Sequence, residues 1–111
     1  MARRVRKRKL GEDRKNKPEI DLSALRHEQD QVARANISML SSWRQDADIT
    51  QAEMGEVLGV SEDVVYKIEA LKRPLSLEGS VAWARRTGKD FHEYIEELCW
   101  KLRKLYPARK S

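Results

Sequence analysis

The side chains that usually carry out catalysis or hold metal ions are scarce in this chain. Its only cysteine is Cys99, and its two histidines, His27 and His92, have no neighbouring ligand residues at metal-binding spacing. A single thiol excludes an internal disulfide and a thiolate zinc cluster. No nucleophilic side chain and general base occur together in a recognisable catalytic motif. We therefore expect no enzymatic activity, no metal ion and no cofactor.

Hydrogen-bonding side chains of another kind gather in the segment 62–71. On a helical wheel at about 100° per residue, one side of this segment is apolar: Val64, Val65, Ile68 and Leu71. The other side can donate and accept hydrogen bonds: Glu62, Asp63, Tyr66 and Lys67. Such a face can contact base edges in a DNA major groove. The same wheel is also typical of an ordinary amphipathic helix between two others.

Charge is distributed unevenly along the chain. Residues 1–19 hold nine basic and three acidic side chains, residues 20–98 hold nine and fifteen, and residues 99–111 hold five and none. We expect 1–19 to be a flexible basic arm that contacts DNA phosphates and releases counterions, through Arg3, Arg4, Arg6, Lys7, Arg8 and Lys9. A solubilising tail without a defined partner is the alternative. Residues 106–111 are expected to be a second basic tail.

The elements that position these residues are predicted to be helices. The 111 residues suffice for one small domain. The chain contains no run of 18 apolar residues, so we expect no membrane-spanning helix. An additional helix is predicted over 20–36, capped by Asp21 or Ser23. Its apolar stripe continues to Trp43, and its ragged period around Gln29 leaves open two helices with a bend. Further helices are predicted over 51–58, from 62 to about 71, from 77 to about 88, and from 91. Their caps and stops are Thr50 with Glu53, Gly59, Ser61, Ser76, Gly88, and Asp90 with Glu93.

Two groups of residues are predicted to pack inside, and the first half of a third is predicted to pack on the domain. The helix 51–58 is expected to turn Ala52, Met54, Val57 and Leu58 inward. Trp43 and Trp83 are expected in the core, and Cys99 is expected to be a buried small apolar group. The last helix carries apolar residues at spacings of 3 and 4, namely Phe91, Ile95, Leu98, Leu102 and Leu105. Trp100 lies nearly opposite this stripe. We expect Leu98, Trp100, Leu102 and Leu105 to form a dimer interface.

The segment Thr50–Ser61, followed by Val65, Ile68 and Glu69, resembles the lambda-repressor-like helix-turn-helix family of Cro/repressor, or xenobiotic-response-element, type. The flanks agree, because Leu40, Trp43 and Arg44 match its first helix. Further matches are Lys72-Arg73-Pro74, Ser76-Leu77-Glu78, Ala84, Gly88 and Phe91. The resemblance covers about 37–98. Met54-Gly55 stands where the family usually has Leu-Ala, and Glu62-Asp63 opens a helix that often begins with uncharged or basic residues.

The resemblance implies an all-α, compact five-helix DNA-binding domain over 37–105, with an extra N-terminal helix and an extended C-terminal helix. It implies that Gln51, Lys72 and Arg73 contact phosphates, with Gln51 at the N-terminus of its helix. The base-reading residues would be Glu62, Asp63, Tyr66 and Lys67. Arg44 and Glu69 would form a structural ion pair.

We therefore expect a cytoplasmic, sequence-specific DNA-binding regulator, a repressor that binds a pseudo-palindromic operator in double-stranded DNA as a homodimer. Two alternatives stay open. The first is an antitoxin whose domain also caps a partner toxin. The second is a protein-interaction module that kept the helix-turn-helix fold and binds a basic protein through Glu62 and Asp63.

Overall fold

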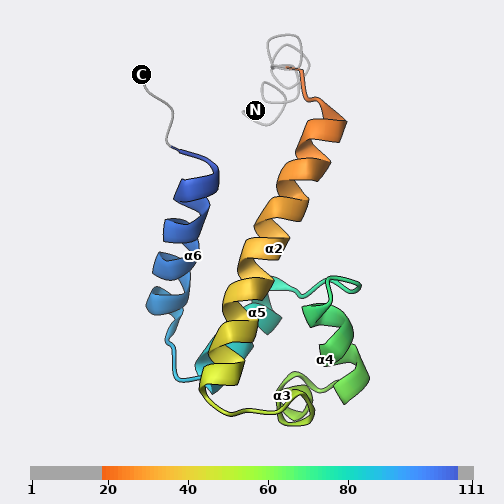
Figure 1. The fold of residues 1–111 in the computed structure, drawn as a ribbon, viewed down its shortest axis with the longest axis vertical. Coiled ribbons are helices and arrows are strands. Elements are labelled where there is room, and N and C mark those ends of the chain that lie inside the picture. The colour runs from red at the N-terminus through yellow and green to blue at the C-terminus, as the bar shows by residue number, and fades with distance from the viewer. Residues whose placement is uncertain (1–18, 108–111) are drawn as a thin grey trace, which may run out of the picture.

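The computed structural model describes residues 19–107, so the arm 1–18 and the end 108–111 lie outside the described part. Between residues 19 and 107 the chain forms five helices and no strand. They are α2 (Leu22–Asp46), α3 (Gln51–Leu58), α4 (Glu62–Glu69), α5 (Leu77–Arg86) and α6 (Phe91–Leu105) (Figure 1). The all-α fold predicted from the sequence is confirmed.

Helix α2 joins the predicted additional helix to the first helix of the domain. The segment 20–36 is helical from Leu22 onward, but it is not a separate helix, because α2 continues without a break for 25 residues to Asp46. No glycine or proline occurs in this stretch, and the glutamine at 29 is a good helix former even though it interrupts the apolar period. Asp21 is the N-cap, and its carboxylate accepts the backbone N–H of Ser23 at 3.0 Å.

The local start and stop signals in the sequence are confirmed. Thr50 and Asp90 each form a capping box with the glutamate three residues later. Ser61 and Ser76 are N-caps whose hydroxyls accept backbone N–H groups. Gly59 has a φ of 74°, a left-handed conformation that glycine adopts without steric cost. The helix ends are therefore set by residues within a few positions of each end.

The core lies where the C-terminal half of α2 meets α3, α4, α5 and α6. Its largest fully buried side chains include Leu40, Met54, Val65, Trp83 and Tyr94. The indole Nε1 of Trp83 donates to the carbonyl oxygen of Leu40 at 2.8 Å, so the buried polar atom has a partner. The core placement of Trp83 is confirmed, and Trp43 is half-buried against the same cluster.

Three predicted core residues are exposed instead. The core contacts α3 along a narrow face formed by Met54 and Gly55, and both Ala52 and Val57 lie outside that face. Cys99 is also exposed, because it follows the half-buried Leu98 and is rotated by about 100° from it on α6. The predictions for Ala52, Val57 and Cys99 are therefore wrong. Phe91, predicted to pack on the domain, is also exposed, because it is the first residue of α6.

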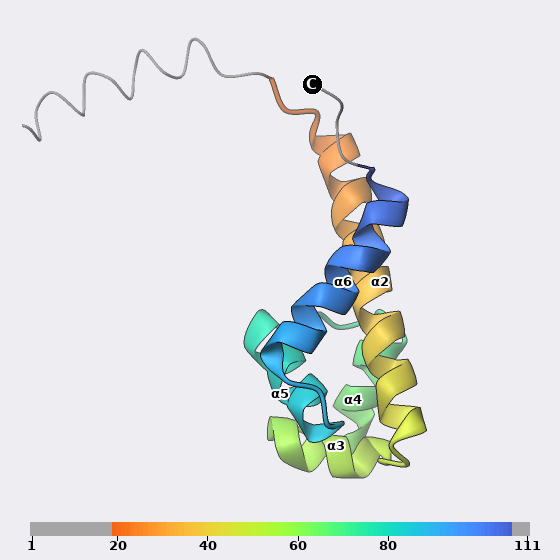
Figure 2. The ribbon, with the colours of Figure 1, turned by 90° about the vertical axis from the view of Figure 1, so that its left-hand side faces the viewer.

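Two helices extend beyond the rest of the molecule. Helices α3, α4 and α5 gather at one end, whereas α2 and α6 both reach toward the opposite end (Figures 1 and 2). Where these two helices meet, the hydroxyl of Tyr94 donates to Asn36 Oδ1 at 2.9 Å, and Asn36 Nδ2 donates to Ser80 Oγ at 3.1 Å. Beyond Asn36 and Tyr94, the first turns of α2 and the last turns of α6 are more exposed.

Candidate nucleic-acid interface

Helix α4 is anchored by its apolar side. Val65 is fully buried, Ile68 is nearly so, and Val64 packs partly against the core. Leu71 was predicted on the same side, but the helix ends at Glu69 and Leu71 lies beyond it with a φ of 63°, exposed. This prediction is wrong because α4 ends at Glu69 and the chain changes direction before residue 71. Val65, Ile68 and the partly buried Val64, three of the four predicted side chains, therefore hold the helix in place.

The outer face of α4 comprises Glu62, Asp63, Tyr66 and Lys67, and all four are exposed. Tyr66 has 54% of its surface exposed, so its phenol can reach an external partner. Glu62 and Asp63 occupy the first turn, where the helix dipole favours negative charge. The structure therefore brings the four predicted base-reading residues together on one accessible face.

Two of these residues pair with each other. Lys67 Nζ lies 3.1 Å from Asp63 Oδ2, one helical turn away, with the two side chains 49% and 67% exposed. An exposed pair of this kind contributes less than about 1 kcal/mol. It partly neutralises the acidic start of α4, and it can open at small cost when another ligand competes for either group.

A nearly buried network fixes the opposite end of α4. Arg44 donates from Nε to Glu69 Oε2 at 2.6 Å and from Nη2 to Glu69 Oε1 at 3.1 Å, and the two side chains are only 12% and 10% exposed. Arg44 Nη1 also donates to the carbonyl oxygen of Ile49 at 2.7 Å. One guanidinium thus connects α2, the segment before α3, and the end of α4.

Gln51 belongs to the same network. Its Nε2 donates to Glu69 Oε1 at 2.8 Å. The sequence had suggested Gln51 as a phosphate contact, and the structure shows that the amide side chain has an internal partner. What Gln51 offers to an outside ligand is its place at the first position of α3, where backbone N–H groups lack helical acceptors.

Gly55 determines how closely the turn approaches α3. A Cβ atom added at Gly55 would lie 2.6 Å from the carbonyl oxygen of Val60, a backbone atom. The backbone N–H of Val60 donates to the carbonyl oxygen of Gly55 at 2.9 Å. The absence of a side chain therefore lets the turn close directly on α3, and this contact sets the position of the start of α4.

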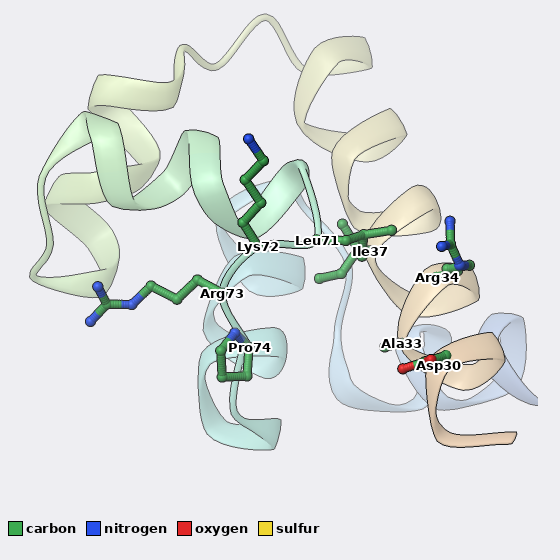
Figure 3. A pocket seen from close by; sticks show the side chains of 8 residues that line it. All are labelled: Asp30, Ala33, Arg34, Ile37, Leu71, Lys72, Arg73 and Pro74. Atoms are coloured by element: carbon green, nitrogen blue, oxygen red, sulfur yellow. The ribbon is translucent and has the colours of Figure 1, made fainter. Parts of the chain in front are cut away.

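Lys72 and Arg73 are exposed on the segment that follows α4. With Arg34 of α2 they line a shallow cavity of about 430 Å³, which Leu71 and Ile37 also border (Figure 3). The Lys72 and Arg73 side chains extend in different directions from the backbone (Figure 3). The other predicted phosphate contacts, Arg3, Arg4, Arg6, Lys7, Arg8 and Lys9, lie outside the described residues.

The predicted dimer residues lie on the projecting part of α6. Leu98 and Leu102 are half-buried, and Leu105 and Trp100 are exposed. Lys104 Nζ lies 3.9 Å from the centroid of the Trp100 ring, a cation–π contact that partly covers this tryptophan. The three leucines share one face, whereas Trp100 lies on another, so the four residues do not form a single patch.

Two groups of contacts have no signal in the sequence. One is made by Asn36, whose amide contacts residues 44 and 58 positions away along the chain. The other is the hydrogen bond from the Gln51 side chain to Glu69. No local signal identifies such partners, because a polar residue in a helix has the same pattern whether it faces solvent or another polar group.

Within residues 19–107, no helix combines the length and apolar composition needed to cross a membrane. The same part of the chain contains no cluster of three or more histidine, cysteine, aspartate or glutamate side chains able to hold a metal ion.

Residues 40–94 match the family model described as Helix-turn-helix. The match begins inside α2, ends inside α6 and includes the whole of α3, α4 and α5. Through these residues the chain belongs to the Cro/repressor-type, lambda-repressor-like helix-turn-helix family, a family of DNA-binding regulators. No curated protein and no solved structure matches the chain.

Proposed function

We propose that this protein is a sequence-specific transcriptional repressor that binds a pseudo-palindromic DNA operator as a homodimer through α4. The observation that carries the proposal is the exposed face of α4, with Tyr66 and Lys67 directed outward from a helix that is anchored on its other side. The Arg44–Glu69 pair supports it, because base reading requires a helix held in a defined orientation.

The chemistry of the outer face suits direct reading of base edges. The Tyr66 hydroxyl can donate or accept, and Lys67 can donate to guanine once its exposed pair with Asp63 opens. Glu62 or Asp63 can accept from cytosine N4. Two carboxylates near phosphates weaken non-specific binding, so we expect affinity to depend on the matched sequence more than in a helix rich in arginine.

Contacts to the DNA backbone would come from residues around α4. Lys72 and Arg73 follow the helix and are exposed, and Gln51 begins α3 with unbonded backbone N–H groups. The arm residues 3–9 would add further phosphate contacts. In the homodimer the two copies of α4 would lie about 34 Å apart, one turn of DNA. Occupancy of the operator would then block transcription.

The test is selection of bound sequences from a random DNA duplex pool at physiological salt. We expect a two-fold-symmetric motif to be enriched. Tyr66→Ala should relax the preference at one position of each half-site, with a loss of about 1–3 kcal/mol in discrimination. Tyr106→Ala is the matched control, because Tyr106 is also an exposed tyrosine but lies after α6. Failure to enrich any sequence would refute the proposal.

One observation favours a second candidate function. Helix α4 begins with two exposed carboxylates, Glu62 and Asp63, and such a surface suits a basic protein partner of an interaction module that kept the helix-turn-helix fold. This function predicts that Glu62→Gln/Asp63→Asn abolishes capture of a cationic protein while no duplex is enriched in the selection. If a DNA motif is enriched and Tyr66→Ala weakens the preference for it, the result favours the repressor over the protein-binding function.

A further inference from the structure

The side of α2 that lies beside the end of α4 has no role in the fold core. Two shallow cavities, of about 430 and 460 Å³, lie between α2 and the segment that follows α4. Both are lined by Arg34, Ile37 and Leu71. Arg34 lies outside residues 40–94, which match the family. The family match therefore assigns no role to Arg34.

The backbone after α4 fixes the place of Lys72 beside α2. The N–H of Lys72 donates to the carbonyl oxygen of Lys67 at 2.8 Å, and the N–H of Leu71 donates to that of Ile68 at 3.0 Å. These two bonds form a Schellman motif, in which Leu71 is the left-handed residue, with a φ of 63°. Lys72 is thus attached to α4 in a defined geometry, one residue after the side chain that lines both cavities.

The first cavity is rich in positive charge. Its lining includes three basic side chains, Arg34, Lys72 and Arg73, and one acidic side chain, Asp30. All three basic side chains are exposed, and none of them forms an ion pair with a carboxylate within residues 19–107. In Figure 3 the Arg34 and Lys72 side chains lie on either side of Leu71 and extend toward the top of the view. This excess of unpaired cations suits an anionic ligand.

The second cavity continues this surface toward the start of α3. Its lining adds hydroxyl and amide groups of α2, namely Ser38, Ser41, Ser42 and Gln45. Its one acidic lining residue is Glu69, whose carboxylate already accepts hydrogen bonds from Arg44 and from Gln51, the first residue of α3. Hydroxyl and amide side chains are common donors to DNA phosphates. The two cavities therefore join the regions around Gln51 and Lys72 through a polar surface of α2.

From these observations we propose that Arg34 binds a phosphate of the DNA backbone beside the phosphate contacts of Lys72. This inference rests on the proposed function, which supplies DNA as the ligand, and it extends the DNA-binding surface onto α2. Two phosphate backbones border the major groove that would hold α4, so a cation next to the end of α4 lies near a backbone. A guanidinium can donate two parallel hydrogen bonds to one phosphate.

The test is a salt titration of DNA binding by the full chain. Fluorescence anisotropy would measure the affinity for the motif enriched in the selection at several salt concentrations. Each phosphate contact contributes about −0.9 to the slope of log affinity against log salt concentration. Arg34→Gln should therefore make the slope shallower by about 0.9, and it should weaken binding about fivefold at physiological salt. The loss should be the same for every DNA sequence, because phosphates carry no sequence information.

Arg26→Gln is the matched control. Arg26 is also an exposed arginine of α2, but it lines neither cavity. This variant should keep the affinity and the salt slope of the unmodified protein. Circular dichroism would verify that both variants retain their helical content, as expected for substitutions of exposed side chains.

A change on the DNA side identifies the contact directly. Single phosphates of the enriched motif would be replaced, one at a time, by uncharged methylphosphonates. At the phosphate that Arg34 binds, the replacement should weaken binding by the unmodified protein and by Arg26→Gln about fivefold. The same replacement should have much less effect on Arg34→Gln, because the contact is already lost in that variant.

Each other outcome overturns a stated part of the reasoning. If Arg34→Gln binds DNA like Arg26→Gln, or if no phosphate replacement distinguishes the two, Arg34 does not bind DNA. An acidic protein segment, which would suit the same cations, would give this result, and the proposed function would still stand on the enriched motif and its response to Tyr66→Ala. If Arg34→Gln changes the base preference, Arg34 contacts a base and the phosphate assignment is wrong. If no duplex is enriched, the proposed function fails together with this inference.

Discussion

The ion pair between Arg44 and Glu69 is the contact on which the orientation of α4 most depends. We predict that Glu69→Gln destabilises the domain by about 3 kcal/mol. The substitution removes the charge that accepts two hydrogen bonds from Arg44, at 2.6 and 3.1 Å, while the guanidinium remains only 12% exposed. An uncompensated buried charge typically costs about 3–5 kcal/mol, and the residual exposure of this pair favours the lower end.

The loss would be a substantial fraction of the stability of a small domain, which is about 5–15 kcal/mol. Arg44→Met should cost a similar amount, because it also removes the bond from Nη1 to the Ile49 carbonyl at 2.7 Å. The double variant Arg44→Met/Glu69→Gln leaves no unpaired charge. Its loss of stability should therefore be smaller than the sum of the losses in the two single variants. We expect a coupling energy of about 2 kcal/mol, within the range measured for contacting residues.

Urea unfolding, followed by tryptophan fluorescence, to which the buried Trp83 contributes, would measure all four members of this cycle. The exposed pair on the same helix is the matched control. A double-mutant cycle with Asp63→Asn and Lys67→Met should give a coupling energy below about 0.5 kcal/mol, because these side chains are 67% and 49% exposed. If the two cycles give equal coupling, the reasoning that burial makes the Arg44–Glu69 pair strong is refuted.

Two further predictions concern stability. Gly55→Ala should destabilise the domain by about 1–3 kcal/mol in the same assay, because the added Cβ would lie 2.6 Å from the Val60 carbonyl oxygen. Gly79→Ala is the control and should cost less, because its Cβ would meet the flexible end of the Leu75 side chain. An increase in stability for Gly55→Ala would contradict the steric argument. For Glu53, the backbone N–H of Thr50, at 2.8 Å, and then the Thr50 side chain hold the carboxyl pKa below its ordinary value of 4.5. Glu53 therefore stabilises the fold above the unfolded pKa, and this contribution is lost as the pH falls through the lower folded pKa. The difference in unfolding free energy between the unmodified protein and Glu53→Gln should shrink between about pH 6 and pH 3, and a constant difference would show that the charge contributes nothing.

The length of α2 is a feature of the fold that the apolar pattern of the sequence left open. The apolar pattern is interrupted at Gln29, and this suggested a bend and a separate helix over 20–36. Backbone hydrogen bonding does not require a regular apolar face, so a segment without glycine or proline remains helical across the interruption. The apolar pattern reports which face is buried, and the first turns of α2 are hardly buried at all.

The sequence by itself determined the helix boundaries at Thr50, Gly59, Ser61 and Asp90, and the outward face of α4. Capping and helical periodicity involve residues a few positions apart, so both can be predicted from the local sequence. Tertiary structure alone decided that Gln51 bonds Glu69, that Asn36 bonds Tyr94, and that Cys99 and Leu71 are exposed. These outcomes depend on which surfaces meet after folding, and one sequence does not encode that locally.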